Sequence, residues 1–572
     1  MRGRTYTMKK LLSVFLAVMM LFAVMAPAAS AVVGYEAVPI IYIRGNGEEI
    51  YDENGNILAS DLDGLLGGDD DEEDSLTKDE IIEACVNILT PFVAEGLIFD
   101  KWDNYGRAIY EELSPLFATS ALDGNGNPQF GTAVSQQKLK DSEYYATQNL
   151  SGGGFGLYEY SFVYDWRLSP YDHVDRLHTY IETIKKATGA KEVCIFVRCF
   201  GGGLAMAYLE RYGNTGIKNV FFNDVLSNGT SLISDGFSGK VAFDGKNVQR
   251  YLKQLEQCAE LEMGTGIAFV ELIDEIITKT LDPFTQVGAT DAVLDGVEGL
   301  YAKLYKALIP AVCFATGIAT QPNYWTCVEA KDFNNAMNLI FGEEGSEARV
   351  HYAGLIEKIE YYRDNVTFKT DELLEKWTKE YGIHIGVGSK YGYIDMPIIE
   401  SANEYGDTLV SLEDSSFGAT CALAGQTLSE DYINGRITAG KGEYISPDKV
   451  LDASTGAFPE TTWYIKNAHH DFNDLSDIIA HEFLIGTGVN VKNATYGRFN
   501  IADEYSRTWA PMTEENCASY DWIYTPVEEP TEETIAISFI RWITVIFNLI
   551  AGLFKGEIKF ESIKDFIASS GM

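Results

Sequence analysis

Basic side chains are scarce in this chain. Its 572 residues include 44 Lys and Arg against 84 Asp and Glu, which gives a formal net charge of −40 at pH 7. A surface of this sign repels polyphosphate, so we exclude binding to nucleic acid. With 46% hydrophobic and 22% charged residues, the composition is otherwise that of a globular protein. The length allows one large domain with insertions.

Cysteine and histidine are also few. Eight cysteines in 572 residues are too sparse for a disulfide-held scaffold, and the chain has no CxxC motif. The seven histidines show no metal-ligand spacing apart from the adjacent pair His469-His470. We therefore predict no metal site and no cofactor. Whether the cysteines form disulfides or stay reduced is open at this point.

Long apolar runs occur only near the two ends of the chain. Residues 11–25 are apolar, follow four basic residues and precede the small-x-small sequence Ala29-Ser30-Ala31. This pattern predicts that residues 1–31 are a signal peptide and that the protein is secreted. A retained N-terminal membrane anchor is the alternative.

The C-terminal run is a different kind of segment. Residues 525–533 form an acidic linker with prolines, and residues 534–572 form a hydrophobic or amphipathic tail. Within 534–554 the only charge is Arg541, and small or polar residues recur every three or four positions. A helix with this stripe either lies in the membrane interface or spans the bilayer against a partner, so we predict association with a membrane or the cell surface. Docking on the main domain or self-association is the alternative.

Strand and helix patterns alternate in the centre of the chain. Residues 38–43, 158–164 and 193–197 read as strands, and another strand begins at Val220. Helices are predicted after Ser169, which we expect to act as N-cap with Pro170 in the first turn, and from Gly202 to about Arg211. Gly189 ends the first of these helices. Such alternation predicts an α/β fold with a mainly parallel sheet.

A mostly helical block interrupts this alternation between about residues 240 and 380. Amphipathic stretches occur at 267–281, 299–311 and 371–381, and strand character returns at 383–388. We interpret the block as a helical cap inserted over the sheet.

The sequence Val197-Arg198-Cys199-Phe200-Gly201-Gly202-Gly203 stands between an apolar strand and a helix. This is the position of the nucleophile elbow, G-x-S-x-G, in which a strained turn exposes the nucleophile and small neighbours avoid clashes. Gly201 and Gly202 fit the downstream small residues. Val197 replaces the first glycine, and Cys199 replaces the serine.

The run Tyr164-Asp165-Trp166-Arg167-Leu168-Ser169-Pro170, followed by a helix and this elbow, resembles the lecithin:cholesterol acyltransferase and lysosomal phospholipase branch of the α/β-hydrolases. The resemblance covers roughly residues 35–490. It implies an α/β-hydrolase domain over residues 32–524, with a mainly parallel sheet flanked by helices. We interpret the Asp165–Arg167 pair and Trp166 as structural, pinning the edge of the sheet.

The same resemblance implies the site residues. The segment 405–411 matches the loop that carries the triad acid, and 462–470 matches the stretch with the triad histidine. Cys199 would be the nucleophile, His470 the base and Asp407 the acid that orients it, in the nucleophile–acid–histidine order of this fold. His469 is the alternative base.

The oxyanion hole follows in the same way. Residues 43–47 match the early oxyanion loop, so the amides of Phe200 and Gly47 would stabilise the oxyanion. A neighbouring histidine or Arg198 would favour the thiolate form of cysteine, which is a stronger nucleophile than a hydroxyl.

Together these features predict a secreted or surface-held lipase- or esterase-like hydrolase that cleaves carboxylic esters or thioesters, with an ester or lipid as substrate. Acyl transfer would use the same residues. The alternative, from a different class, is a catalytically inactive α/β-hydrolase-like protein that binds a ligand or partner under its cap.

Overall fold

The computed structural model describes residues 38–45, 50–51, 57–59, 102–117, 119–130, 156–158, 160–226, 229–240, 254, 303, 305–394, 399–504 and 506–517. Its centre is an eight-stranded sheet with the strand order β14-β13-β12-β7-β6-β5-β1-β4. All neighbouring strands in it are parallel except the pair β13 and β14. The predicted α/β fold with a mainly parallel sheet is therefore confirmed.

The strands of the main sheet are β1 (Ile40–Ile43), β4 (Tyr160–Phe162), β5 (Val193–Arg198), β6 (Ile217–Asn223), β7 (His384–Tyr391), β12 (Thr462–Lys466), β13 (Phe499–Asp503) and β14 (Thr508–Pro511). Three small antiparallel pairs lie outside it: β2 (Ile50–Tyr51) with β3 (Ile57–Ala59), β8 (Tyr393–Ile394) with β9 (Tyr405–Gly406), and β10 (Thr420–Cys421) with β11 (Leu451–Asp452).

The α-helices in the described residues include α4 (Asp103–Phe117), α6 (Val174–Thr188), α7 (Gly201–Tyr212), α8 (Ser231–Ser238), α12 (Pro322–Trp325), α13 (Phe333–Phe341), α14 (Glu347–His351), α15 (Ala353–Asn365), α16 (Thr370–Glu375), α17 (Leu412–Ser415), α18 (Glu430–Thr438) and α19 (Asp474–Ile485).

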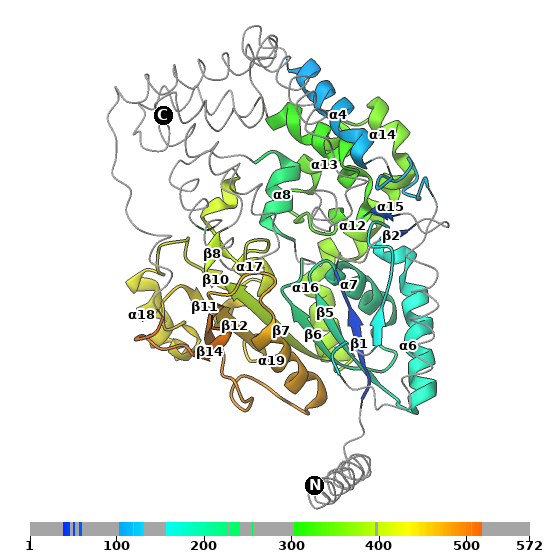
Figure 1. Ribbon diagram of the computed structural model, residues 1–572. Coiled ribbons are helices and arrows are strands. Elements are labelled where there is room, and N and C mark those ends of the chain that lie inside the picture. The colour runs from blue at the N-terminus through cyan, green and yellow to red at the C-terminus, as the bar shows by residue number, and fades with distance from the viewer. Residues whose placement is uncertain are drawn as a thin grey trace, which may run out of the picture.

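Helices cover both faces of the sheet, because its central strands carry apolar side chains on both faces. Successive side chains of a strand point to opposite faces. On β5, Ile195 and Val197 join a hydrophobic cluster with α6 and α7, whereas Cys194 and Phe196 join a second cluster with α19. Strands buried on both faces read as continuous apolar runs, which explains the unbroken apolar sequence of β5 (Figure 1).

Several expected boundaries differ from the structure by a few residues, among them the starts of α6 and β6. The helix expected at Ser169 begins as a short 3-10 turn, Pro170–Asp172, and the α-helix starts only at Val174. Ser169 is the N-cap residue of this turn and Pro170 stands in its first position, as predicted, but the Ser169 side chain makes no capping hydrogen bond. His173 lies between the two segments, and its ring nitrogen Nε2 lies 2.8 Å from the carbonyl oxygen of Asp165. Strand β6 starts at Ile217, three residues before the predicted Val220.

Gly189 ends α6 in the left-handed conformation, with φ of 75°, as predicted. Helix α7 and strand β7 also lie where the sequence places them.

Residues 305–380 are mostly helical. Side chains between Cys313 and Ile359 form a hydrophobic cluster around Trp325 and Phe341, whereas those between Tyr362 and Trp377 pack into the cluster on one face of the sheet. In Figure 1, α4, α8, α13 and α14 gather at the top of the view, above the sheet. The predicted helix at 371–381 is α16 followed by a π-helical turn, Lys376–Glu380. The predicted helix at 267–281 lies outside the described residues.

The predicted signal peptide (1–31), acidic linker (525–533) and C-terminal tail (534–572) also lie outside the described residues. Within the part of the chain that is described, no helix has both the length and the hydropathy needed to cross a membrane.

Candidate active site

Cys199 occupies a strained turn between β5 and α7. Its φ of 52° is left-handed, a conformation that costs a non-glycine residue about 1–3 kcal/mol and persists only when its surroundings hold it. Here the amide of Gly202 donates to the Cys199 carbonyl at 3.1 Å, and the Cys199 amide donates to the Asn223 carbonyl at 3.4 Å. The turn therefore presents the cysteine side chain at the carboxyl end of β5.

The glycines after Cys199 are required by atoms that lie close to them. A Cβ on Gly201 would lie 2.5 Å from the carbonyl oxygen of Ile43, and one on Gly203 would lie 2.9 Å from the side-chain oxygen of Asn323. Val197, which replaces the first glycine of the elbow pattern, is fully buried in β5 and pairs in regular register. The larger side chain is thus accommodated within the strand.

His470 and Asp407 form a buried hydrogen-bonded pair. Nδ1 of His470 lies 2.8 Å from Oδ2 of Asp407, and the His470 amide donates to the Asp407 carbonyl at 2.8 Å. The other carboxylate oxygen accepts from the amides of Leu409 at 3.0 Å and Val410 at 2.8 Å. These contacts fix the carboxylate and orient the imidazole with Nε2 pointing away from Asp407.

The electrostatics of the pair favour a protonated imidazole beside an ionised carboxylate. Burial by itself lowers the pKa of His470, but the charge of Asp407, followed by that of Cys199, holds this pKa well above its usual range. Burial by itself raises the pKa of Asp407, yet His470 and then Lys390 outweigh it and hold the pKa below its usual value. Such an arrangement stabilises the imidazolium that forms when histidine accepts a proton.

Nε2 of His470 is buried and has no hydrogen bond of ordinary geometry within the described residues. The side chain of Cys199 is nonetheless close enough to raise the pKa of this histidine. The structure therefore brings Cys199, His470 and Asp407 together, with the free imidazole nitrogen available to exchange a proton with the sulfur or with a bound water.

His469 is held by a different carboxylate. Its Nδ1 lies 2.7 Å from Oε1 of Glu504, and its backbone amide donates to the same oxygen at 2.6 Å. Its ring makes an edge contact with Tyr393. Of the two adjacent histidines, the one paired with Asp407 is His470, so the geometry favours His470 over the alternative base.

The first oxyanion donor expected from the sequence lies beside the sulfur. Phe200 precedes the first turn of α7, where helix amides have no partner within the helix. A Cβ on Gly45 would lie 2.9 Å from the Phe200 nitrogen and 3.2 Å from the Cys199 sulfur. The missing side chain of Gly45 thus keeps the space in front of both groups open. The second expected donor, Gly47, lies outside the described residues.

Apolar side chains surround the sulfur. Phe200, Leu226, Cys327 and Val410 form a buried cluster against which Cys199, Ile233 and Tyr324 pack. The ring of Tyr324, from α12, lies 4.6 Å from that of Phe200. An apolar setting of this kind weakens screening by water and strengthens each charge interaction in the site.

Two residues beneath the pair were missed in the sequence. Lys390, on β7, and Asp224, directly after β6, form a fully buried ion pair with Nζ 2.9 Å from Oδ2. Their positions at the ends of predicted strands could have identified them, because polar residues at the carboxyl ends of neighbouring parallel strands meet at one edge of the sheet. Asp224 also has a positive φ of 44°, which the sequence does not reveal.

The Tyr164-Asp165-Trp166-Arg167 segment makes the structural contacts expected of it. Arg167 binds both carboxylate oxygens of Asp165, at 3.0 and 2.8 Å, and its Nη1 donates to the carbonyl of Thr119 at 3.1 Å. The Tyr164 hydroxyl donates to the Arg44 carbonyl at 2.9 Å. The segment therefore anchors edge strand β4 and the loop that follows β1.

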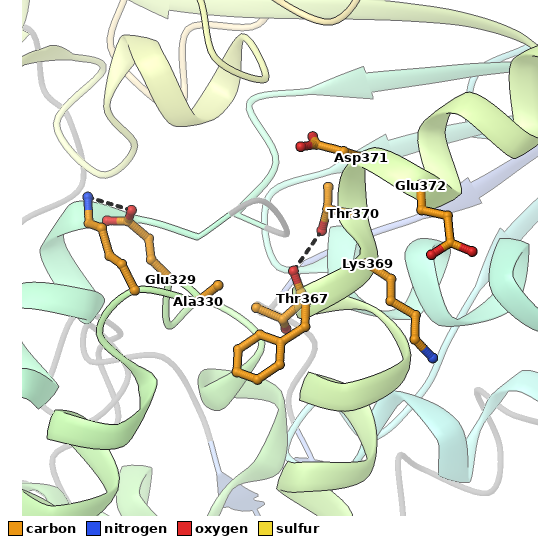
Figure 2. A pocket seen from close by; sticks show the side chains of 9 residues that line it. Glu329, Ala330, Thr367, Lys369, Thr370, Asp371 and Glu372 are labelled. Atoms are coloured by element: carbon orange, nitrogen blue, oxygen red, sulfur yellow. Dashed lines mark hydrogen bonds and ion pairs between the residues drawn. The ribbon is translucent and has the colours of Figure 1, made fainter.

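A polar hollow of about 610 Å³ lies between residues 329–331 and 367–372 (Figure 2). Lys331 and Glu329 form an ion pair at 2.7 Å on one side of it. None of its lining residues belongs to the Cys199 site, so we treat it as a separate feature.

The six cysteines in the described residues, at positions 194, 199, 313, 327, 421 and 517, are all free thiols. The same residues contain no cluster of three or more His, Cys, Asp or Glu side chains arranged for a metal ion.

Comparison of the chain with protein-family models and with curated proteins finds no match.

Proposed function

We propose that this chain is a secreted or surface-held hydrolase of the α/β-hydrolase superfamily, similar to the lecithin:cholesterol acyltransferase and lysosomal phospholipase branch. It cleaves carboxylic esters or thioesters through Cys199, His470 and Asp407. The observation that carries the proposal is Cys199 on a left-handed turn after β5, close to a histidine whose other nitrogen is bound by a buried carboxylate.

The arrangement of these residues in the fold supports the proposal. Cys199 follows β5, Asp407 lies between β7 and β12, and His470 follows β12. This is the nucleophile–acid–histidine order of α/β-hydrolases. The helical segment between β6 and β7 includes α12, whose Tyr324 packs on Phe200. We interpret this segment as the cap.

In the first half of the reaction, the proton of the Cys199 thiol passes to Nε2 of His470 before the attack, and the sulfur attacks the carbonyl carbon of the substrate as the thiolate. The developing oxyanion accepts a hydrogen bond from the Phe200 amide, with a further amide expected from the loop at Gly47. As the tetrahedral intermediate collapses, His470 gives the proton to the leaving alcohol or thiol, and an acyl thioester remains on Cys199.

In the second half, water attacks the acyl thioester and His470 accepts one of its protons. The carboxylic acid leaves, and the proton returns to the sulfur. Acyl transfer replaces water by an alcohol and leaves every protein role unchanged. The apolar cluster around Cys199 supports an apolar acyl group as the part of the substrate nearest the sulfur.

The test is a panel of nitrophenyl esters and acyl thioesters of increasing chain length, assayed with wild-type protein, Cys199→Ala and Cys199→Ser. Cys517→Ala serves as the matched control, because Cys517 is a free, partly buried thiol remote in sequence from the site. We expect the control to retain activity and Cys199→Ala to lose it by at least about 10³-fold. Full activity of Cys199→Ala would refute the nucleophile.

A ligand-binding protein without turnover is the second candidate. The observation that favours it is the lack of an ordinary hydrogen bond between Nε2 of His470 and the sulfur. Wild-type protein that cleaves no member of the panel, while binding an ester tightly, would support this candidate. Greater activity of Cys199→Ser than of wild type would mean that the site geometry suits oxygen rather than sulfur.

The surface-held location rests on residues 534–554 alone. We propose that this segment retains the protein at a membrane or cell surface. Full-length protein and a chain ending at Tyr524 should then partition differently without detergent, and equal solubility of the two would refute the anchor.

A further inference from the structure

Lys390 is completely buried beneath the candidate site, and its ammonium faces oxygens from two directions. On one side, Oδ2 of Asp224 lies 2.9 Å from Nζ. On the other, Nζ donates to the carbonyl of His469 at 3.2 Å, to the carbonyl of His470 at a shorter distance, and to Oδ1 of Asn473 at 3.0 Å. Three of the four oxygens therefore belong to the segment that carries His470.

Asp224 is tied to the end of β7 as well. Its Oδ1 accepts from the Lys390 amide at 3.0 Å, and its own amide donates to the Gly388 carbonyl at 3.0 Å. Asn473 is held from below, because its side-chain oxygen also accepts from Nδ2 of Asn223 at 3.2 Å. The ammonium thus links the ends of β6 and β7 to the turn that follows β12.

Within the described residues, the ring of His470 is bound at Nδ1 by Asp407, and its backbone carbonyl accepts from Lys390. The imidazole is oriented by the Asp407 contact at Nδ1, but the position of the ring relative to Cys199 depends on where the backbone of residues 469–473 lies. Lys390 is the side chain that binds two consecutive carbonyls of this segment. A displacement of about 1 Å at such a position can cost about 10²-fold in rate.

We propose that Lys390 is a positioning residue for the Cys199 reaction: its ammonium holds the carbonyls of His469 and His470 so that Nε2 of His470 faces the sulfur, and Asp224 neutralises the charge. This inference rests on the function proposed above.

A second buried Lys–Asp pair in the protein serves as a control, because its loss should affect stability but not the position of His470. Lys466, on β12, is equally buried and binds Oδ2 of Asp448 at 2.8 Å and the carbonyl of Cys517 at 2.7 Å. Its ammonium contacts neither histidine carbonyl in the described structure. The double variant Lys466→Met/Asp448→Asn therefore removes a buried Lys–Asp pair without touching the proposed support of His470.

The test variant is Lys390→Met/Asp224→Asn, which removes both charges and so avoids leaving one buried charge unpaired. Folding is measured by circular dichroism and by the urea midpoint. The rate at which iodoacetamide alkylates Cys199 is measured by mass spectrometry at about pH 6.5, where a solitary thiol is mostly protonated and reacts slowly. The most active ester of the panel supplies kcat and KM.

We expect the test variant to fold. Iodoacetamide should alkylate its Cys199 about tenfold more slowly than in wild type, at the rate seen in His470→Ala. Its kcat should fall about 10²-fold with little change in KM. The Lys466 control should keep the wild-type alkylation rate and kcat. If the methionine variant does not fold, Lys390→Gln/Asp224→Asn replaces it. The glutamine amide is one bond too short to reach the His470 carbonyl, so the same losses are expected.

Two results would overturn the inference: a folded test variant that alkylates and turns over like wild type, or a control pair that loses as much activity as the test pair. Failure of the proposed function itself gives a different result: iodoacetamide then alkylates Cys199 no faster in wild type than in His470→Ala. That result would mean that the sulfur and the imidazole are not coupled, and Lys390 would then have no reaction to support.

Discussion

Gly45→Ala would place one methyl group between the Cys199 sulfur and the Phe200 amide, where the substrate carbonyl is expected to bind. The new Cβ would lie 2.9 Å from the Phe200 nitrogen, 3.0 Å from Cβ of Cys199 and 3.2 Å from its sulfur. The nearest of these atoms is backbone at the elbow, which is held by hydrogen bonds to Gly202 and Asn223 and cannot yield as a flexible side chain does.

The magnitude follows from what the methyl group blocks. It occupies the space in front of the Phe200 amide, where the oxyanion would sit, and loss of one oxyanion donor costs about 10²–10³ in kcat, or about 2.7–4 kcal/mol of transition-state stabilisation. The approach of any electrophile to the sulfur is blocked as well. We therefore expect ester cleavage to fall at least about 10²-fold and alkylation of Cys199 by iodoacetamide to fall with it.

The matched control is Gly435→Ala. Gly435 lies in α18, and a Cβ there would meet no atom within 4 Å. Alanine in a helix interior is more favourable than glycine by about 0.5–1 kcal/mol, so this variant should be slightly more stable in urea and fully active. If Gly45→Ala folds and keeps wild-type kcat and alkylation, the oxyanion assignment of Phe200 and the role of Gly45 are both wrong.

Three further predictions concern the scaffold. Arg167→Met leaves the buried carboxylate of Asp165 unpaired and should lower the free energy of unfolding in urea by about 3–5 kcal/mol; a loss below about 1 kcal/mol would contradict the pinning role. Burial raises the pKa of Glu404 to about 7, so the folded protein binds more protons than the unfolded chain between the unfolded pKa of about 4.3 and pH 7, and stability falls as pH rises through this window. Glu404→Gln should accordingly be more stable than wild type by about 1–3 kcal/mol at pH 8 but not at pH 4, and equal pH profiles of the urea midpoint would refute it. Gly386→Ala places a Cβ 2.8 Å from the ring of Phe221 and should lower the free energy of unfolding by about 1–3 kcal/mol, which a thermal melt at constant pH will test.

Local patterns were enough to predict much of the sheet and the elbow. Three features depend only on neighbours within a few residues: the apolar run of β5, the glycines after Cys199 and the helix end at Gly189. The local sequence was therefore sufficient to predict each of them. Ser169 and Pro170 begin the helical region as predicted, but the sequence did not reveal that this region starts as a 3-10 turn and becomes α-helical only at Val174.

The order of Cys199, Asp407 and His470 along the chain was also visible in the sequence, through the resemblance of their surrounding motifs. What the order could not decide was which of two adjacent histidines faces the acid. That choice depends on Asp407 and Glu504, which lie 63 and 35 residues away from their respective histidines and reach them only after β7, β12 and β13 are paired.

The buried Lys390–Asp224 pair belongs wholly to the tertiary structure. A lysine near the end of a strand carries no local signal of its partners, because its acceptors come from the residue after β6 and from the turn after β12. The sequence by itself determined which segments become strands, helices and the cysteine turn, since these follow from side-chain period and backbone sterics. Only the tertiary structure decided which charges and carbonyls meet beneath that turn, because those contacts exist only when distant strands lie side by side.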